Sequence, residues 1–133
     1  MADLLDSNVV IPYLASDPAI VPLVERFALE GAAMSIVTYV EAYQGTLRGP
    51  DPLRAQVRFE DVLSEIPVLP FSLSIARGCA RLREDLKGRG RRVRDRALDL
   101  VIAATAIEHD LQLVTRNRVD FADIPELTLY LLD

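Results

Sequence analysis

The sequence contains little sulfur and only one imidazole, and these shortages exclude several kinds of site. Cys79 is the single cysteine, so an internal disulfide and a thiolate metal site are both excluded. His109 is the single histidine, which excludes a paired-histidine zinc site. The longest nearly apolar run, residues 100–107, is far shorter than the roughly 20 residues of a membrane-spanning helix. No basic and apolar leader is visible at the start, and we therefore expect a cytoplasmic protein without a membrane segment.

The composition is typical of one soluble domain. The chain has 133 residues, of which 50% are hydrophobic and 26% charged, so we expect a single domain over residues 1–133. The formal net charge of −5 argues against a protein that coats nucleic acid. Nine of the 15 basic residues nevertheless fall between Arg77 and Arg96. This basic segment is interpreted either as a solvated helix face with a loop or as a strip that contacts phosphates.

Short apolar runs alternate with helical patterns along the chain. Strands are expected to end at Asp6 and to cover residues 34–37, 66–69, 111–114 and 127–131. Helices are expected over residues 18–29, after Thr38, and over residues 53–64, 72–87 and 95–109. Strands that alternate with helices predict an α/β fold whose parallel sheet is covered on both faces.

Five polar residues stand out from this pattern. Asp6 and Glu41 follow predicted strands, as do Asn117 and Asp120, whereas Asp99 interrupts an apolar helix. Ligands bind beyond the carboxyl ends of parallel strands, so we expect these residues to meet at one rim of the sheet. Carboxylates at one rim repel one another, and Mg²⁺ is the simplest compensation because it takes oxygen ligands and leaves positions for water and phosphate.

Each of these residues also has a structural interpretation. The alternatives are a turn cap at Asp6, a capping box of Glu41 with Thr38, an ion pair of Asp99 with Arg94 or Arg96, a turn at Asn117, and a cap by Asp120 on a short helix over residues 121–124. A shared site explains all of them together. The chain has no P-loop, no G-x-G-x-x-G fingerprint and no G-x-S-x-G elbow, which leaves metal-assisted phosphodiester cleavage as the candidate chemistry.

Four motifs resemble the PIN-domain family, and within it the VapC-type ribonuclease toxins of toxin–antitoxin pairs. They are residues 5–11 (LDSNVVI), 35–41 (SIVTYVE), 98–106 (LDLVIAATA) and 114–125, which contain VTRN and later DF and IP. The resemblance implies a three-layer α/β/α fold and endoribonuclease activity on structured RNA such as transfer or ribosomal RNA. It also implies Mg²⁺ or Mn²⁺ as cofactor, a homodimer, and inhibition by a VapB-like antitoxin.

The resemblance also assigns roles to the polar residues. Asp6, Glu41 and Asp99 match the family's three principal acids, and both Asn117 and Asp120 are candidates for the fourth position. We expect Asp6 and Asp99 to hold the metal. The residues expected to contact the substrate are Ser7, Thr115, Arg116, Arg92 and Arg94.

Two other functions stay open at this point. One is a metal-dependent phosphohydrolase of a small substrate, although Asn8 stands where the haloacid-dehalogenase pattern has an aspartate. The other is a protein-binding module without catalysis. Release of phosphate from metabolites would favour the first function, and absence of magnesium binding would favour the second.

Overall fold

The computed structural model describes residues 3–132 of the chain. Met1, Ala2 and Asp133 lie outside the described residues, so the expectation of no leader peptide and the outer limits of the domain are not tested. The described part contains five strands and six helices. In chain order these are β1 (Asp3–Leu5), α1 (Ser7–Leu14), α2 (Val21–Glu30), β2 (Ala32–Ser35), α3 (Ile36–Thr46), α4 (Pro52–Leu63), β3 (Val68–Leu69), α5 (Leu73–Gly88), α6 (Ala97–Glu108), β4 (Gln112–Thr115) and β5 (Leu129–Leu131).

The strands form one parallel sheet, as the sequence predicted. The strand order is β3-β2-β1-β4-β5, with β1 at the centre. Leu4 of β1 lies opposite Ala33 of β2 on one side and Leu113 of β4 on the other. The chain first fills the sheet from β1 toward β3 and later from β4 to β5. β1 and β4 therefore flank the topological switch point, where parallel α/β proteins bind ligands at the carboxyl ends of the strands.

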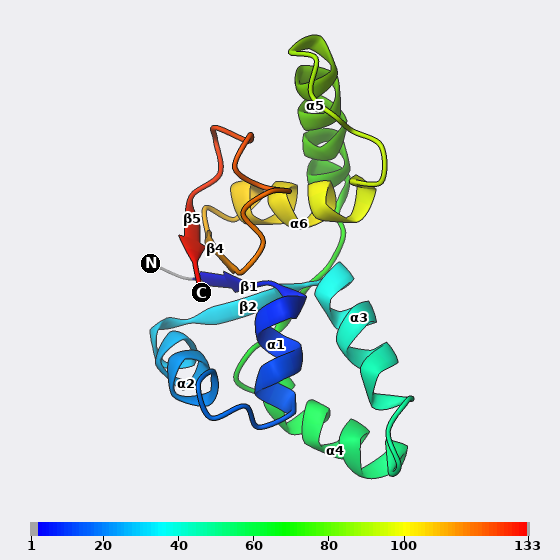
Figure 1. Cartoon of the computed structure of the whole chain (residues 1–133), viewed down its shortest axis with the longest axis vertical. Helices are drawn as coiled ribbons and strands as arrows, with labels where there is room; N and C mark the ends of the chain where they lie inside the picture. The colour runs from blue at the N-terminus through cyan, green and yellow to red at the C-terminus, as the bar shows by residue number, and fades with distance from the viewer. Residues whose placement is uncertain (1–2, 133) are drawn as a thin grey trace.

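Helices cover both faces of the sheet (Figure 1). α5 and α6 lie on one side, whereas α1, α2 and α4 lie on the other. Successive strand residues point to opposite faces, and they build two cores accordingly. Leu4 and Leu113 belong to the core beneath α5 and α6, while Leu5 and Val114 belong to the core with α1 and α2. The α/β/α prediction is confirmed.

Helix α1 is an element that the sequence patterns do not predict. Val9, Val10 and Ile11 are β-branched and Pro12 disfavours a helix interior, so this stretch resembles an extended segment. In the structure Asp6 caps the helix, and Val9 and Val10 are buried in the core. Burial of this apolar face outweighs the weak helix propensity.

The boundary between β2 and α3 also differs from the prediction. β2 ends at Ser35, and the Ser35 hydroxyl accepts the backbone N–H of Thr38 at 3.2 Å, which makes Ser35 the N-cap of α3. Thr38 lies inside the helix, so the capping box of Thr38 with Glu41 is wrong. Glu41 is consequently in the second turn of α3 rather than in the first.

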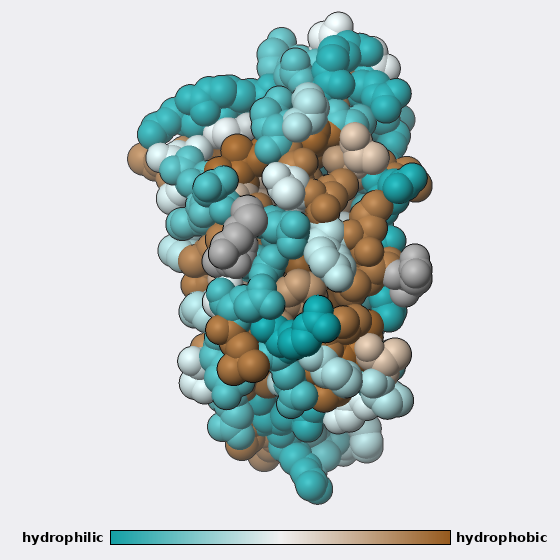
Figure 2. Space-filling model, turned by 90° about the vertical axis from the view of Figure 1, so that its left-hand side faces the viewer, coloured by the Kyte–Doolittle hydropathy of each residue, from teal (hydrophilic) through white to brown (hydrophobic). Residues whose placement is uncertain are grey.

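The surface varies along the length of the molecule. The end that contains the C-terminal part of α5 and the following basic segment is hydrophilic, whereas hydrophobic residues are exposed on the middle of the face in Figure 2. Between residues 3 and 132, no helix has both the length and the apolar composition of a membrane span.

Candidate functional site

Asp6 lies where the central strand β1 ends and α1 begins. Its side chain is buried, and each carboxylate oxygen is held by a hydrogen bond. Oδ1 accepts the backbone N–H of Ser7 at 2.7 Å, and Oδ2 accepts the hydroxyl of Thr115 at 2.7 Å. Burial raises the pKa of Asp6 above its usual value, although the hydrogen bonds from Thr115 and Ser7 act in the opposite direction. The carboxylate is thus fixed beside the switch point.

Thr115 acts on Asp6 rather than on a substrate. Its side chain is 0% exposed, so the predicted substrate contact is wrong. Its oxygen accepts the backbone N–H of Asn117 at 3.0 Å and the side-chain amide of Asn8 at 3.3 Å. The Asn8 Oδ1 atom accepts the backbone N–H of Arg116 at 3.2 Å. Asn8 was not among the predicted site residues, and the one signal for it in the sequence is its position two residues after Asp6.

Asp99 is the third residue of α6 and is half-buried. Burial, followed by the negative charges of Asp120 and Asp6, raises its pKa to about 6. The position of Asp99 in the first turn of α6 favours the ionised carboxylate, but this helix-terminus effect on the pKa is smaller than that of burial and the neighbouring charges. Among residues 3–132, neither Arg94 nor Arg96 forms an ion pair with Asp99. The structural alternative for Asp99 is therefore wrong, and Asp99 stays a candidate for the functional site.

Asn117 and Asp120 form a compact turn after β4. The Asn117 side-chain amide donates to Asp120 Oδ2 at 2.7 Å, and the Asp120 backbone N–H donates to Asn117 Oδ1 at 3.2 Å. Arg92 reaches the other carboxylate oxygen of Asp120 at 2.8 Å, with about half of its side chain exposed. Residues 119–123 form turns and no helix follows Asp120, so the predicted helix cap by Asp120 is wrong. Asn117 orients Asp120 and also donates to Thr115, which connects both candidates for the fourth position to the site.

Glu41 and Asp99 line the same open cavity. The cavity measures about 410 Å³ and is completed by Asp95, Ala97 and Leu98. The charge of Glu41 contributes to the raised pKa of Asp99. The structure therefore brings the three predicted principal acids to one region: Asp6 and Glu41 both act electrostatically on Asp99.

The basic segment has a structural role that the sequence analysis does not predict. Arg96 is 2% exposed, and its guanidinium binds both carboxylate oxygens of Asp123, at 2.7 and 2.9 Å. The same side chain donates to the backbone carbonyls of Asp120 and Arg92 at 2.7 and 2.8 Å. Arg91 also approaches Asp123, at 3.5 Å. Arg96 thus anchors the basic segment to the turn that carries Asp120.

Four of the five residues predicted to contact substrate are accessible. Arg94 and Arg116 are exposed, and Ser7 is half-buried with its hydroxyl 3.5 Å from Asp6 Oδ1. Their contact with a substrate stays a prediction. Arg92 is accessible as well, but it would have to share its guanidinium between Asp120 and a substrate.

The donor set suits a hard divalent cation. Asp6, Glu41, Asp99 and Asp120 supply carboxylate oxygens, which Mg²⁺ and Mn²⁺ prefer, and His109 is exposed at the far end of α6. Within residues 3–132 no three acidic, histidine or cysteine side chains form a preassembled metal cage. Mg²⁺ in proteins commonly has one or two carboxylate ligands and several waters.

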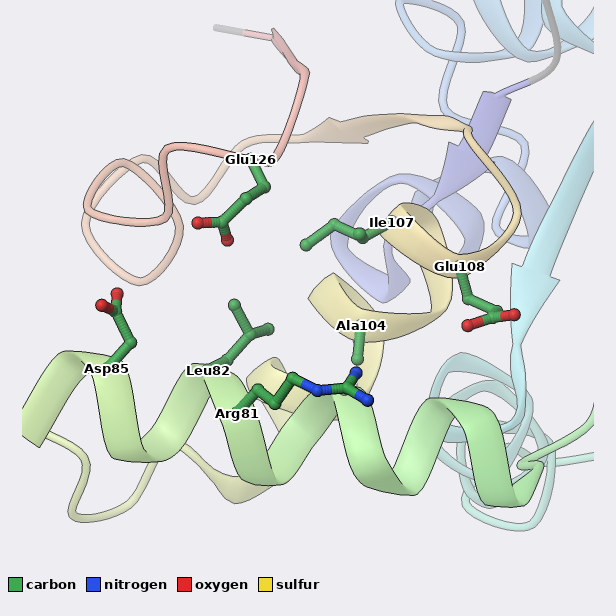
Figure 3. Close-up of a pocket in the computed structure, with 8 residues that line it drawn as sticks. Arg81, Leu82, Asp85, Ala104, Ile107, Glu108 and Glu126 are labelled. Atoms are coloured by element: carbon green, nitrogen blue, oxygen red, sulfur yellow. The ribbon is translucent and has the colours of Figure 1, made fainter.

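A second cavity lies between α5, α6 and the loop before β5, and it has a different character. It measures about 370 Å³, and Leu82, Ala104 and Ile107 form its apolar part. Figure 3 shows Asp85 and Glu126 facing one another at one end of it. No carboxylate of the Asp6 and Asp99 region lines this cavity.

Comparisons with known proteins agree with this geometry. The PIN domain family model matches residues 4–127. The tRNA(fMet)-specific endonuclease VapC of Shigella flexneri is 32% identical over 120 residues, which cover 89% of this chain and 88% of that protein. Ribonuclease VapC2 of Haemophilus influenzae is 28% identical with the same coverage.

Solved structures show the same similarity. In the crystal structure of VapBC2 from Rickettsia felis bound to a promoter DNA fragment, one chain matches with a TM-score of 0.85 and 25% identity over 100% of both chains. A chain of the DNA-bound VapBC from Salmonella typhimurium matches with a TM-score of 0.82 and 27% identity over 98% of both chains. The chain therefore belongs to the PIN domain family, and within it to the VapC-like ribonucleases.

Proposed function

We propose that this protein is the toxin of a VapBC-type pair and that it uses Mg²⁺ to hydrolyse phosphodiester bonds in structured RNA, such as transfer or ribosomal RNA. One observation carries the proposal: Asp6 and Asp99 lie at the switch point, and the charge of Asp6 helps to raise the pKa of Asp99. Neither has an ion-pair partner among residues 3–132. The Shigella flexneri relative, named as specific for tRNA(fMet), supports the RNA substrate class.

Asp6 and Asp99 are the residues that we assign to the metal. A bound Mg²⁺ or Mn²⁺ ion would supply Lewis-acid activation of the phosphoryl group and a lower pKa for the attacking water. Thr115 and Ser7 hold the Asp6 carboxylate in one orientation. Glu41 and Asp120 are the remaining carboxylates that act on Asp99, and either is suited to accept a proton from the attacking water.

Arginines around the site are suited to hold the RNA backbone. Arg94 and Arg116 are exposed, and guanidinium groups bind phosphates with paired hydrogen bonds. Arg92 would contact RNA from the position where it also neutralises Asp120. Arg89, Arg91 and Arg96 pair with Asp85 or Asp123 instead. Within the basic segment we therefore assign RNA contact to Arg92, whose partner Asp120 belongs to the site, and to Arg94.

The partner that we propose is a VapB-like antitoxin. Its support is that the similar solved structures include VapBC complexes and the FitAcB protein of Neisseria gonorrhoeae. We also propose a homodimer, which light scattering of the purified protein tests directly.

Cleavage of a mixture of transfer and ribosomal RNA tests the proposed function. The assay compares Mg²⁺ with chelator, and wild type with Asp6→Asn. Asp3→Asn is the matched control, because Asp3 is also a buried carboxylate on β1 but lies at the opposite end of the strand. We expect cleavage by wild type and Asp3→Asn with Mg²⁺, and none with chelator or Asp6→Asn.

The alternatives give different results in the same experiments. Unchanged cleavage by Asp6→Asn would contradict the assignment of the site. Release of phosphate from small metabolites without RNA cleavage would favour a phosphohydrolase. A calorimetric titration without Mg²⁺ binding would favour a protein-binding module.

A further inference from the structure

Asn8 connects two segments that border the site. It lies in the first turn of α1, and its side chain reaches across to the end of β4. Its amide nitrogen donates to the Thr115 hydroxyl oxygen at 3.3 Å, and its amide oxygen accepts the backbone N–H of Arg116 at 3.2 Å. One side chain therefore contacts two consecutive residues 107 and 108 positions away in the chain.

These contacts determine the direction of the Thr115 hydroxyl group. The backbone N–H of Arg116 can only donate, so the Asn8 amide oxygen must face it and the amide nitrogen must face Thr115. The Thr115 oxygen also accepts the backbone N–H of Asn117 at 3.0 Å. Both of its lone pairs are then engaged, and the hydroxyl proton has one acceptor left, Asp6 Oδ2 at 2.7 Å.

We propose that Asn8 is a positioning residue for Asp6, acting through the hydroxyl of Thr115. Without Asn8 the Thr115 oxygen keeps a free lone pair, and its hydroxyl rotor is less restricted. Asp6 would then lose part of the constraint on its Oδ2 atom. The inference rests on the proposed function, because it concerns the carboxylate that we assign to the metal.

A simpler role for Asn8 would be to tie α1 to the segment after β4. The chain contains a comparable hydrogen bond away from the site. The Gln112 side-chain amide donates to Asp3 Oδ1 at 3.0 Å and joins β4 to β1 at the opposite end of these strands. A tie of either kind would affect stability. Only a positioning role would affect metal binding and turnover as well.

A double-mutant cycle between Asn8 and Thr115 separates these roles. The proteins are wild type, Asn8→Ala, Thr115→Val, the double variant, and Gln112→Ala as the matched control. The measurements are the Kd for Mg²⁺ by calorimetry without RNA, kcat and KM on RNA, and thermal unfolding. Loss of a side chain that orients a metal ligand costs about 10- to 100-fold in metal affinity or activity.

For Asn8→Ala we expect Mg²⁺ binding weakened by about 10-fold, a lower kcat and an unchanged KM. In the Thr115→Val background the same substitution should change the Kd by less than about twofold, because the hydroxyl through which Asn8 acts is absent. In a Thr115→Ser background, which keeps the hydroxyl, Asn8→Ala should regain its effect. Gln112→Ala should lower stability and leave the Kd and kcat unchanged.

Three results would overturn the inference. Additive effects of Asn8→Ala and Thr115→Val would mean that Asn8 does not act through Thr115. A change in stability alone would make Asn8 a structural tie. Fast exchange of the Thr115 hydroxyl proton in NMR spectra of the wild type, which needs no variant, would contradict the fixed hydroxyl. If the wild type itself neither binds Mg²⁺ nor cleaves RNA, the proposed function fails instead.

Discussion

Asp99 and Asp123 both lie close to Arg96, yet their environments are opposite. Asp99 is only three residues from Arg96 in sequence, but Arg96 pairs with Asp123, which is 27 residues away. The hydrogen bonds from Arg96 lower the pKa of Asp123, whereas burial and the neighbouring carboxylates raise the pKa of Asp99 to about 6. The fold thus directs the hydrogen bonds of the buried guanidinium to Asp123, and Asp99 receives from Arg96 only an electrostatic effect that is weaker than the opposing ones.

The difference in ion pairing separates a carboxylate that stabilises the fold, Asp123, from one that we assign to the functional site, Asp99. A buried carboxylate without a cation destabilises the protein, and such groups concentrate at functional sites. Asp120 is intermediate, because its partner Arg92 is half-exposed and an exposed pair contributes little to stability. The lowered pKa of Asp123 reflects its ion pair with Arg96, whereas the raised pKa of Asp99 reflects burial and neighbouring carboxylates at the site that we propose.

The largest effect is expected from removing the buried cation. Arg96→Met leaves the Asp123 carboxylate with only the more exposed Arg91 and should reduce the free energy of unfolding by about 3–5 kcal/mol. Urea unfolding measures this loss. The double variant Arg96→Met, Asp123→Leu should recover much of it, because no unpaired charge remains. A loss below about 1 kcal/mol for Arg96→Met would contradict a structural role for the ion pair between Arg96 and Asp123.

Asp99→Asn should have opposite effects on activity and stability. We expect RNA cleavage to fall by more than about 100-fold, since Asp99 is assigned to the metal. At pH 7.5 the metal-free variant should be more stable than wild type, because a repelled carboxylate has become neutral. Glu84→Gln, at an exposed position within α5, is the control in which we expect neither change. A destabilised Asp99→Asn protein would contradict the assignment of Asp99 to an uncompensated site.

Asp99 and Asp123 should also make the stability of the metal-free protein respond to pH in opposite directions. The folded-state pKa of Asp99 is raised, so stability should increase as the pH falls from about 6 toward the ordinary value of 3.8. The folded-state pKa of Asp123 is lowered, so its contribution is present above 3.8 and is lost as the pH falls below it.

Thermal unfolding between pH 3 and 8 with chelator present measures this prediction. Asp99→Asn should flatten the curve on the high-pH side, and Asp123→Asn should flatten it on the acid side. A curve for Asp99→Asn that parallels the wild type would show that Asp99 titrates normally.

The smallest effect is expected at the exposed edge of the basic segment. Arg94→Ala should weaken RNA binding by a few-fold and reduce the slope of log K against log salt by about 0.7–0.9, the value for one phosphate contact. Filter binding at several salt concentrations measures the slope. Arg26→Ala on α2 is the control, because Arg26 is exposed on the opposite side of the sheet. Equal slopes for both variants would exclude Arg94 from the RNA contact.

Most strands and helices could be predicted because their patterns are local. Ser72, for example, precedes a helical apolar pattern and caps α5 as expected. Helix α1 could not be predicted because its β-branched residues and Pro12 disfavour a helix. Burial against the sheet and the cap by Asp6 stabilise it. The end of β2 was misplaced because Ile36 and Val37 have strand propensity but occupy the first turn of α3.

The acids of the site could be proposed from the sequence because each follows a strand or interrupts an apolar helix. Their partners could not, since pairing depends on distant segments. The sequence does not indicate that Arg96 pairs with Asp123, or that Thr115 is buried under the network from Asn8. A charge run likewise does not show which of its members are anchored, so Arg96 could not be distinguished from Arg94.

The parallel sheet has a consequence for how the protein is made. Asp6 and the Thr115 hydroxyl are 109 residues apart in the chain, and β4 must pair with β1 before they meet. During synthesis the N-terminal part of a domain emerges first, at about 5–20 residues per second. A nascent chain therefore carries Asp6 for several seconds without the hydroxyl that orients it. The site is assembled only after β4 has left the ribosome, so an unfinished chain would not present an organised nuclease site to the RNA of the ribosome that makes it.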